Sequence, residues 1–224
     1  GYDWRLIRRI LTIGFTPFII IAMDNVMIIT MNAILQKYGG AARGDLLITC
    51  ATIAQSFMLV VTMPLGGITS GTQAVLAYNF GAGNTDRVKG AQKYIFILAA
   101  AYTTLLFILA RTVGGLFVRL FTSDPTVAAE ALRAIRIFTL AIIPLAFQYE
   151  IVDGFTGLGQ VQVALPLSFF RKGLYFVSLF LLPAMFGAEA AFFAEPVSDI
   201  AGPVVSAIVY IVSMKGILAK AGKN

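Results

Sequence analysis

The feature that most restricts the fold is an uncharged stretch from Leu46 to Thr85, 40 consecutive residues without Asp, Glu, Lys or Arg. A helix needs only about 20 apolar residues to cross a hydrocarbon core of about 30 Å. Over the whole chain, 58% of the 224 residues are hydrophobic and 12% are charged. Soluble domains carry about 25% charged residues. The sequence therefore predicts an integral membrane protein.

Six apolar segments alternate with charged ones, and each is long enough to cross the bilayer as a helix. We expect the six spans at residues 10–35, 46–80, 94–110, 127–155, 166–186 and 190–214. Before the fourth span, Asp124 or Ser123 is expected to cap a helix whose first turn holds Pro125. No internal repeat or soluble domain is evident. Residues 1–224 are therefore expected to form a single all-α membrane unit.

The basic residues are divided unequally between the two faces of the membrane that six spans define. The face with both termini would hold Arg5, Arg8, Arg9, Arg87, Lys89, Lys93, Arg171, Lys172, Lys215, Lys220 and Lys223. The opposite face would hold Lys37, Arg43, Arg111, Arg119, Arg133 and Arg136. Basic residues are enriched in cytoplasmic loops, so both termini are predicted to lie in the cytoplasm of a plasma-membrane protein. The basic residues behind the net charge of +6 are then explained by the orientation of the protein in the membrane, and no nucleic-acid partner is predicted.

The composition also argues against several kinds of catalytic site. The chain has no histidine, which excludes Ser–His and Cys–His nucleophilic pairs and removes the commonest zinc ligand. Cys50 is the single cysteine, so no internal disulfide can form. An intramembrane enzyme acting on lipids is therefore disfavoured, and no cofactor is predicted.

A segment rich in glycine and amide residues, TMPLGGITSGTQAVLAYNFGAGN, lies within the uncharged stretch. Gly67 and Gly71 are four residues apart, a spacing that lets helix backbones approach closely in lipid. Pro64 and the glycines that follow it predict a bend that frees backbone groups. Gln73 and Asn79 would offer hydrogen bonds to a neighbouring helix or a cavity. Helix packing alone would explain these residues equally well.

The longer string PLGGITSGTQAVLAYNFGAGNTDRVKGA, which includes Gly81, resembles a segment of the multidrug and toxic compound extrusion (MATE) family. That family carries Pro-x-Gly-Ile-x-x-Gly-x-Gln, then Asn-aromatic-Gly-Ala and a basic loop. The segments LFTSDPTVAAEALRAIRIF, DGFTGLGQ, PLSFFRKG and AEPVSDIAG resemble further family segments in the same order, with Lys172 where Gln is usual. The order matches the C-terminal six-helix lobe, spans seven to twelve of a twelve-helix, two-lobe transporter.

The resemblance implies an antiporter that exports organic, often cationic and amphiphilic, compounds in exchange for Na⁺ or H⁺. Its implied partners are the lipid bilayer, a small organic substrate, the coupling ion and an N-terminal six-helix lobe that this sequence does not contain. Two alternatives stay open. One is a flippase for lipid-linked precursors from the same superfamily, which would have a more cationic cavity. The other is a membrane lobe that is inactive alone, as a fragment or as one of two chains.

Carboxylates within the spans are the first candidates for substrate or ion binding, because burying an unpaired charge in a bilayer costs several kcal/mol. Asp24 lies in the middle of the first span. Glu150 and Asp153 are three residues apart on one predicted helix face, where they could share a proton or hold Na⁺. Asp24 is the alternative Na⁺ site. Asp199, in the last span, falls in a segment of the resemblance, and lobe packing would explain it equally well.

Four polar residues complete the set of candidates. Asn25 and Asn32 are seven residues apart and would line one face of the first span. Gln148 could add a ligand beside Glu150. Arg171 is expected at the cytoplasmic end of the fifth span, where it would pair with a carboxylate or extend to water. The alternative for Asp24 is a structural hydrogen bond to a neighbouring helix. The alternative for Glu150 and Asp153 is a place near the cytoplasmic end of the span, where water reaches them.

Overall fold

A computed structural model describes residues 4–221, with the backbone alone for residues 5–6 and 8–21. The elements in chain order are α1 (Trp4–Gly71), α2 (Gln73–Gly81), α3 (Thr85–Thr112), α4 (Gly114–Val118), α5 (Pro125–Phe138), the 3₁₀ turn η1 (Thr139–Ala141), α6 (Ile142–Gly157), α7 (Val161–Phe186), the 3₁₀ segment η2 (Ala188–Phe193) and α8 (Ala194–Leu218). Within the described residues, five helical segments are long and apolar enough to cross a membrane. The first of them reverses direction and so supplies two spans, which confirms the all-α, six-span prediction.

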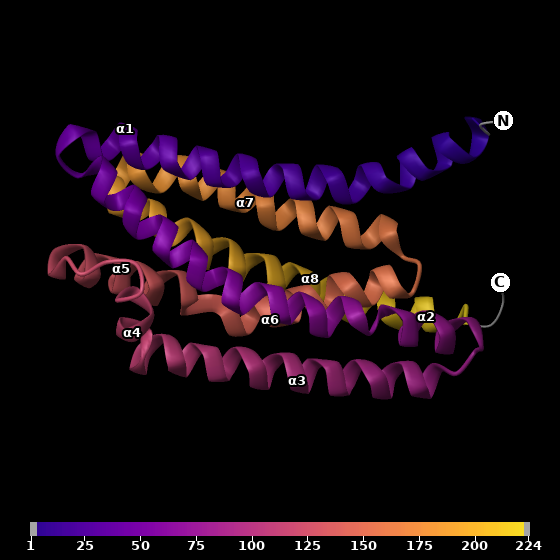
Figure 1. Cartoon of the computed structure of the whole chain (residues 1–224). Coiled ribbons are helices and arrows are strands. Elements are labelled where there is room, and N and C mark those ends of the chain that lie inside the picture. The colour runs from indigo at the N-terminus through magenta and orange to yellow at the C-terminus, as the bar shows by residue number, and fades with distance from the viewer. Residues whose placement is uncertain (1–3, 222–224) are drawn as a thin grey trace.

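The reversal within α1 depends on glycine at two positions. Gly40 has φ 62° and ψ −167°, a left-handed conformation that other residues rarely adopt. A Cβ added at Gly39 would lie 2.9 Å from the Cα of Gly44, so the two sides of the turn touch there. The first arm of α1 (residues 4–39) and its second arm (residues 41–71) therefore run in opposite directions from this turn (Figure 1).

Pro64 does not break the second arm of α1, although the sequence predicts a bend there. Among the described residues of α1, non-helical backbone angles occur at Gly40 alone. The helix is interrupted eight residues after the proline, at Thr72, which has φ −90° and ψ −8° and separates α1 from α2. The predicted freeing of a backbone group does occur, because the Val60 carbonyl accepts a hydrogen bond from Tyr102 on α3.

The third and fourth predicted spans differ most from the structure. The third span starts at Thr85 rather than at residue 94, because the basic residues after the turn form the first turns of α3. The fourth span is two helices, α5 and α6, joined by the turn η1. Its predicted start is correct, since the Asp124 carboxylate accepts hydrogen bonds from the backbone N–H groups of Thr126 (2.7 Å) and Val127 (3.3 Å).

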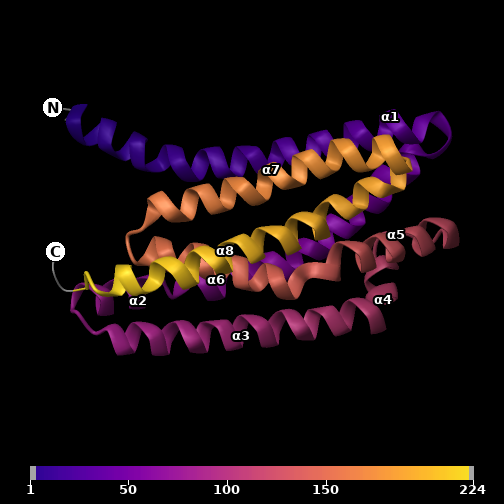
Figure 2. The same cartoon turned by 180° about the vertical axis from the view of Figure 1, so that it is seen from behind.

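The helices form a bundle with an apolar core toward each end. Helix α7 packs on α8, α6 packs on α8 and α3, and α1 packs on α5. Phe138, Met31 and Leu35 belong to the core near the α1 reversal, and Phe155 and Leu76 belong to the other. The start of α1 and the end of α8 lie at the same end of the bundle, as an even number of crossings requires (Figures 1 and 2).

Candidate functional site

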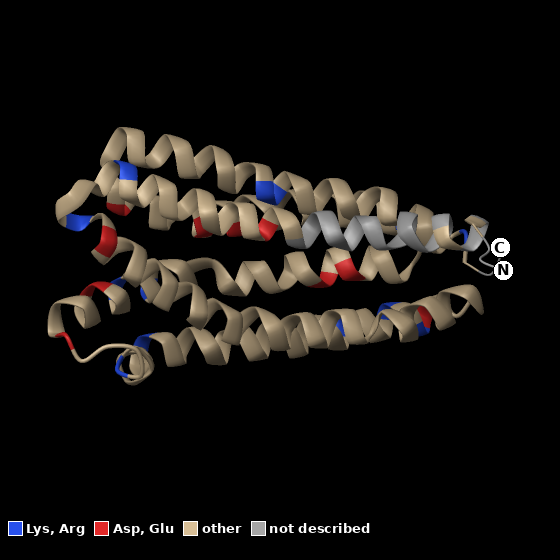
Figure 3. Cartoon of the chain, turned by 45° about the horizontal axis from the view of Figure 1, so that its top comes forward, with Lys and Arg blue, Asp and Glu red and all other residues tan. Residues whose placement is uncertain are grey.

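A cavity of about 570 Å³ lies between the two arms of α1 and helices α6 and α7. Small-molecule sites in proteins have volumes of roughly 300–1,000 Å³. Apolar side chains, among them Met27, Met58 and Leu145, form much of its wall. Its polar and charged lining residues are Asp24, Thr52, Gln55, Ser56, Thr62, Gln148, Tyr149, Asp153, Ser168, Arg171, Lys172, Tyr175 and Glu195. Figure 3 shows that acidic positions lie along the middle of the helices as well as at their ends.

Asp24 on the first arm of α1 and Lys172 on α7 form an ion pair in the cavity wall. The Asp24 side chain is 52% exposed, whereas the Lys172 side chain is 4% exposed. An unpaired charge at this depth would cost several kcal/mol, so each group stabilises the charge of the other. The carboxylate at the cavity surface is therefore already compensated by a cation from the protein.

Arg171 lies in the middle of α7, so its predicted place at the cytoplasmic end of the span is wrong. Its Nη1 atom is 2.9 Å from Oδ1 of Asp199 on α8, which is fully buried. Its aliphatic stem packs on Gly202, where an added Cβ would lie 2.9 Å from the Arg171 Cγ. Of the two alternatives for Arg171, pairing with a carboxylate is correct. This pair connects α7 to α8.

Asp153, near the end of α6, is bound by two donors from the glycine-rich segment. Thr69 Oγ1 donates to its Oδ2 (2.5 Å), and Gln73 Nε2 donates to its Oδ1 (2.9 Å). Thr69 belongs to α1 and Gln73 to α2, so the carboxylate connects the two helices across the interruption at Thr72. A Cβ added at Gly157 would lie 3.1 Å from the Gln73 Cα, so this contact needs glycine. Gln73 thus bonds to a neighbouring helix, which is one of the two alternatives that the sequence leaves open, and does not line the cavity.

Glu150 does not line the cavity, although Asp153, three residues later on α6, does. Glu150 is fully buried, and neither of its carboxylate oxygens has a hydrogen-bond partner among the described residues. It lies toward α3, because a Cβ added at Gly154 would be 3.7 Å from Glu150 Oε1 and 2.9 Å from Gln92 Nε2. Three residues turn a helix by about 300°, which leaves the two side chains about 60° apart. That offset separates the cavity wall from the helix interface.

The other polar candidates divide between the cavity and helix contacts. Gln148 lines the cavity, accepts a hydrogen bond from Ser206 on α8 (2.6 Å) and donates one to the Leu167 carbonyl (3.4 Å). Asn25 and Asn32 are not among the described residues that line the cavity. The residues of the first arm of α1 that line the cavity are instead Asp24, Met27 and Ile28.

The glycine pair predicted to bring helices together has no helix against it in the described chain. A Cβ added at Gly67 or Gly71 would meet no atom within 4 Å, and the same holds for Gly81 at the end of α2. Close helix approach at this pair is thus absent among the described residues. Asn79 Nδ2 donates within its own helix to the Val75 carbonyl (2.9 Å) rather than to a neighbour.

The cavity offers ligands for a hard cation and for an organic cation alike. The carboxylates of Asp24 and Asp153, the Gln55 amide and the hydroxyl groups of Thr52 and Ser56 are oxygen ligands of the kind that hard cations prefer. No group of three or more His, Cys, Asp or Glu side chains within residues 22–221 is arranged to hold a metal ion. The wall therefore combines dispersed carboxylates with apolar and aromatic surface.

Lys172 lines the cavity, although the sequence predicts it only as one of the basic residues on the face with both termini. One signal was available, since Lys172 stands where the resembled segment usually has Gln. Glu195, also in the cavity wall, is three residues before Ser198 and four before Asp199 on α8. Its place in the cavity depends on how α8 is rotated against α7, which no local pattern specifies.

Comparison with known proteins gives consistent matches. The model of the MatE family matches residues 21–182. Multidrug export protein MepA of Staphylococcus aureus (strain N315) is 23% identical over 184 residues, which cover 81% of this chain and 39% of that protein. The inward-facing structure of a multidrug resistance MATE family transporter of the MOP superfamily has a TM-score of 0.85 at 14% identity, covering 97% of this chain and 50% of that chain.

A second structure is that of a MOP superfamily transporter from Pyrococcus furiosus Vc1, whose binding pocket has a reverse polarity that suggests a different function. It has a TM-score of 0.81 at 15% identity and covers 97% of this chain and 48% of that chain. This chain thus spans half or less of the length of these relatives. Since the family model matches most of its length, the chain belongs to the MATE family, a family of multi-pass membrane transporters and not of enzymes.

Proposed function

We propose that this chain is the C-terminal six-helix lobe of a secondary active antiporter. Its substrates are organic, often cationic and amphiphilic, compounds, exported in exchange for Na⁺ or H⁺. The observation that carries the proposal is the cavity, in which Asp24, Asp153 and Glu195 interrupt a largely apolar wall. Apolar and aromatic side chains suit the organic body of such a compound, and carboxylates attract its positive charge. The relative MepA is a multidrug export protein.

In the proposed mechanism, substrate and coupling ion compete for the same carboxylates, Asp24 and Asp153. A cation or proton that neutralises one of these groups lowers its affinity for a cationic substrate, so binding of one ligand favours release of the other. Glu150 is a second candidate for the ion. A buried carboxylate without a hydrogen-bond partner requires a proton or a cation to neutralise it.

The proposal includes a partner lobe and an orientation. The other wall of the cavity would come from an N-terminal six-helix lobe, since this chain superposes on half of a MATE transporter. Both termini would lie in the cytoplasm of a plasma-membrane protein. The excess of basic residues on that face and the common end of the first and last helices support this orientation.

A flippase for lipid-linked, anionic precursors is the second candidate, and one observation favours it. Arg171 and Lys172 line the cavity, so its charges are more mixed than the sequence predicts. The Pyrococcus furiosus transporter shows that pocket polarity varies within this fold. Both cations here are paired, however, with Asp199 and Asp24 respectively. The titratable side chains of the wall that remain outside these two ion pairs include, among the described residues, the carboxyl groups of Asp153 and Glu195 and no further Lys or Arg, which favours the exporter.

Efflux of a fluorescent lipophilic cation from cells tests the exporter. Cells would express this chain alone, the chain with an N-terminal six-helix lobe of the family, and that pair carrying Asp24→Asn or Asp153→Asn. We expect efflux from the unmodified pair. In both variants the efflux rate should fall at least tenfold, which corresponds to a barrier higher by about 1.4 kcal/mol.

The control is membrane expression of each variant at the level of the unmodified chain. Efflux that persists in both variants would move the coupling site to Glu150 or to the other lobe. A paired sample without efflux of the cation, but with transport of a lipid-linked anion, would reject the exporter in favour of the flippase.

A further inference from the structure

We propose that Lys172 is a tethered counter-cation that competes with cationic ligands for Asp24. A ligand would then bind at this carboxylate only by displacing the Lys172 ammonium group. The inference deepens the proposed function, on which it rests for the class of ligand. It assigns to Lys172 a role in setting affinity, and nothing in the chain's local sequence pattern requires a lysine at this position.

The Lys172–Asp24 ion pair differs from the adjacent Arg171–Asp199 ion pair in its access to the cavity. Arg171 and Lys172 are neighbours on α7, and each pairs with a carboxylate on another helix. Asp199, the partner of Arg171, is 0% exposed and lies outside the cavity wall, whereas Asp24 is 52% exposed and lines the cavity. A ligand in the cavity can therefore reach the carboxylate of one pair and not that of the other.

The two cations also differ in the shape and flexibility of their side chains. The Arg171 stem packs on Gly202, and its planar guanidinium is fixed against Asp199. Lysine carries a compact ammonium group on a flexible four-carbon stem, which reorients at lower cost than a guanidinium held in a fork. We therefore expect Lys172 to leave Asp24 more readily than Arg171 leaves Asp199.

The cavity contains acceptors for the displaced ammonium group. Asp153 and Glu195 line the same cavity as Lys172 and are the other two carboxyl groups of its wall. Moving a buried cation from one carboxylate to another avoids the cost of leaving it unpaired, which amounts to several kcal/mol. Ligand binding at Asp24 would therefore rearrange the ion pairs of the wall rather than leave a buried charge unpaired.

The consequence is a competition that lowers the affinity of the site for every cation. A ligand gains the Asp24 interaction only after Lys172 loses it. Compounds whose apolar bodies also contact the cavity wall can offset this loss, while small inorganic cations have no such contact. If Lys172 competes with ligands, removing it should strengthen cation binding. If Lys172 instead supported the site, removing it would weaken cation binding or leave it unchanged.

Binding of tetraphenylphosphonium to the chain paired with an N-terminal lobe in nanodiscs tests this inference. We expect Lys172→Gln to lower the dissociation constant about tenfold, within the range usual for coupled sites. The double variant Asp24→Asn/Lys172→Gln should lose this gain, because it removes the carboxylate that was released. Lys93→Gln, the same change at an exposed position on α3, is the matched control and should bind as the unmodified chain does.

Thermal unfolding of each variant shows whether it folds. If Lys172→Gln does not fold, Lys172→Met replaces it. That variant also removes the competing charge and should likewise bind the probe more tightly than the unmodified chain. Probe binding by Lys172→Gln that is unchanged or weaker overturns the inference, as does a gain that survives in the double variant. Tighter binding by Lys172→Gln without efflux from any paired sample would support the inference while rejecting the exporter.

Discussion

At the scale of single residues, Pro64 shows how the fold satisfies a backbone group inside the membrane. Proline has no N–H, so the Val60 carbonyl four residues earlier lacks its helical donor. Water is absent from the bilayer core, and an unsatisfied carbonyl there is costly. The Tyr102 hydroxyl on α3 donates to Val60 O over 2.6 Å and takes the place of the missing donor. One hydrogen bond thus satisfies the carbonyl and joins α3 to the second arm of α1.

This assignment predicts that Tyr102 and Pro64 are energetically coupled. Tyr102→Phe should lower the free energy of unfolding by about 1 kcal/mol, because the Val60 carbonyl loses its donor. In a Pro64→Ala background the restored N–H serves that carbonyl, so the same change should have little effect. A double-mutant cycle, measured by unfolding in detergent micelles, compares the effect of Tyr102→Phe in the unmodified chain with its effect in the Pro64→Ala variant. An equal loss in both backgrounds would show that Tyr102 acts through packing alone.

The sequence indicates the polar residues of the spans better than it indicates their partners. Gln73 was predicted to hydrogen-bond to a neighbour, and it does so with Asp153. For Arg171 a carboxylate partner was one of two alternatives. The pairing of Lys172 with Asp24, 148 positions apart, was not predicted. Such pairs depend on the rotation and depth of separate helices, which the hydrophobic pattern of each helix does not determine.

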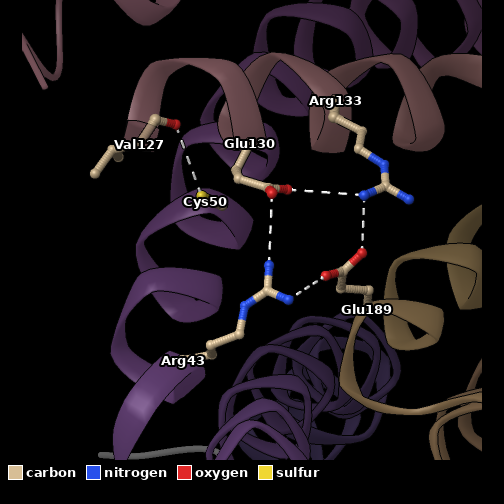
Figure 4. A network of polar contacts seen from close by, with 6 residues as sticks. All are labelled: Arg43, Cys50, Val127, Glu130, Arg133 and Glu189. Atoms are coloured by element: carbon tan, nitrogen blue, oxygen red, sulfur yellow. Dashed lines mark hydrogen bonds and ion pairs between the residues drawn. The ribbon is translucent and has the colours of Figure 1, made fainter. Parts of the chain in front are cut away.

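At the scale of elements, four charged side chains join three segments near the α1 reversal (Figure 4). Arg43 begins the second arm of α1, Glu130 and Arg133 lie on α5, and Glu189 lies on η2. Glu189 is 2.8 Å from each arginine, and Glu130 is 3.5 Å from Arg43 and 3.9 Å from Arg133. Each acid thus contacts both bases, and the network connects elements that the loops leave separate.

Glu189→Gln should destabilise this end of the bundle modestly. It removes the two shortest ion pairs of the network, but their side chains are 31–59% exposed and screened by solvent. We expect a loss of about 1 kcal/mol or less in the free energy of unfolding, which decreases further at high salt. Unfolding at low and high salt measures it. Asp86→Asn, which breaks an exposed 3.8 Å pair with Lys89, is the control, and a salt-independent loss would contradict an electrostatic role.

Hydrophobicity along the chain predicted the spans well because a lipid-exposed helix must be apolar over its whole length. It did not predict where helices break. The turn η1 divides the fourth span within an apolar run, and the start of α3 lies among basic residues. Hydropathy changes little at η1, because only the backbone geometry changes there. At the start of α3 the basic residues lower the hydropathy although they are already helical. The capped start of α5 was predicted correctly, since Asp124 and Pro125 act locally.

At the scale of the whole molecule, one apolar face of the second arm of α1 and of α2 is covered by no other described element. Residues about four apart lie on this face, namely Met63 (71% exposed), Gly67, Gly71, Val75 (51% exposed) and Tyr78 (75% exposed). The open space beside the two glycines would accept another helix backbone. Under the proposed function, the N-terminal lobe is the element that contacts this face.

Gly67→Leu should therefore impair association of the two lobes without affecting the fold of this one. The leucine side chain has open space in the described lobe, but it would prevent a second backbone from approaching closely. We expect about tenfold weaker association, equivalent to roughly 1.4 kcal/mol. Gly216→Leu, at an exposed glycine of α8 with equally open space, is the matched control. Energy transfer between labelled lobes in nanodiscs measures the association. Equal loss in both variants would indicate a nonspecific effect, and no loss in Gly67→Leu would place the lobe contact on another face.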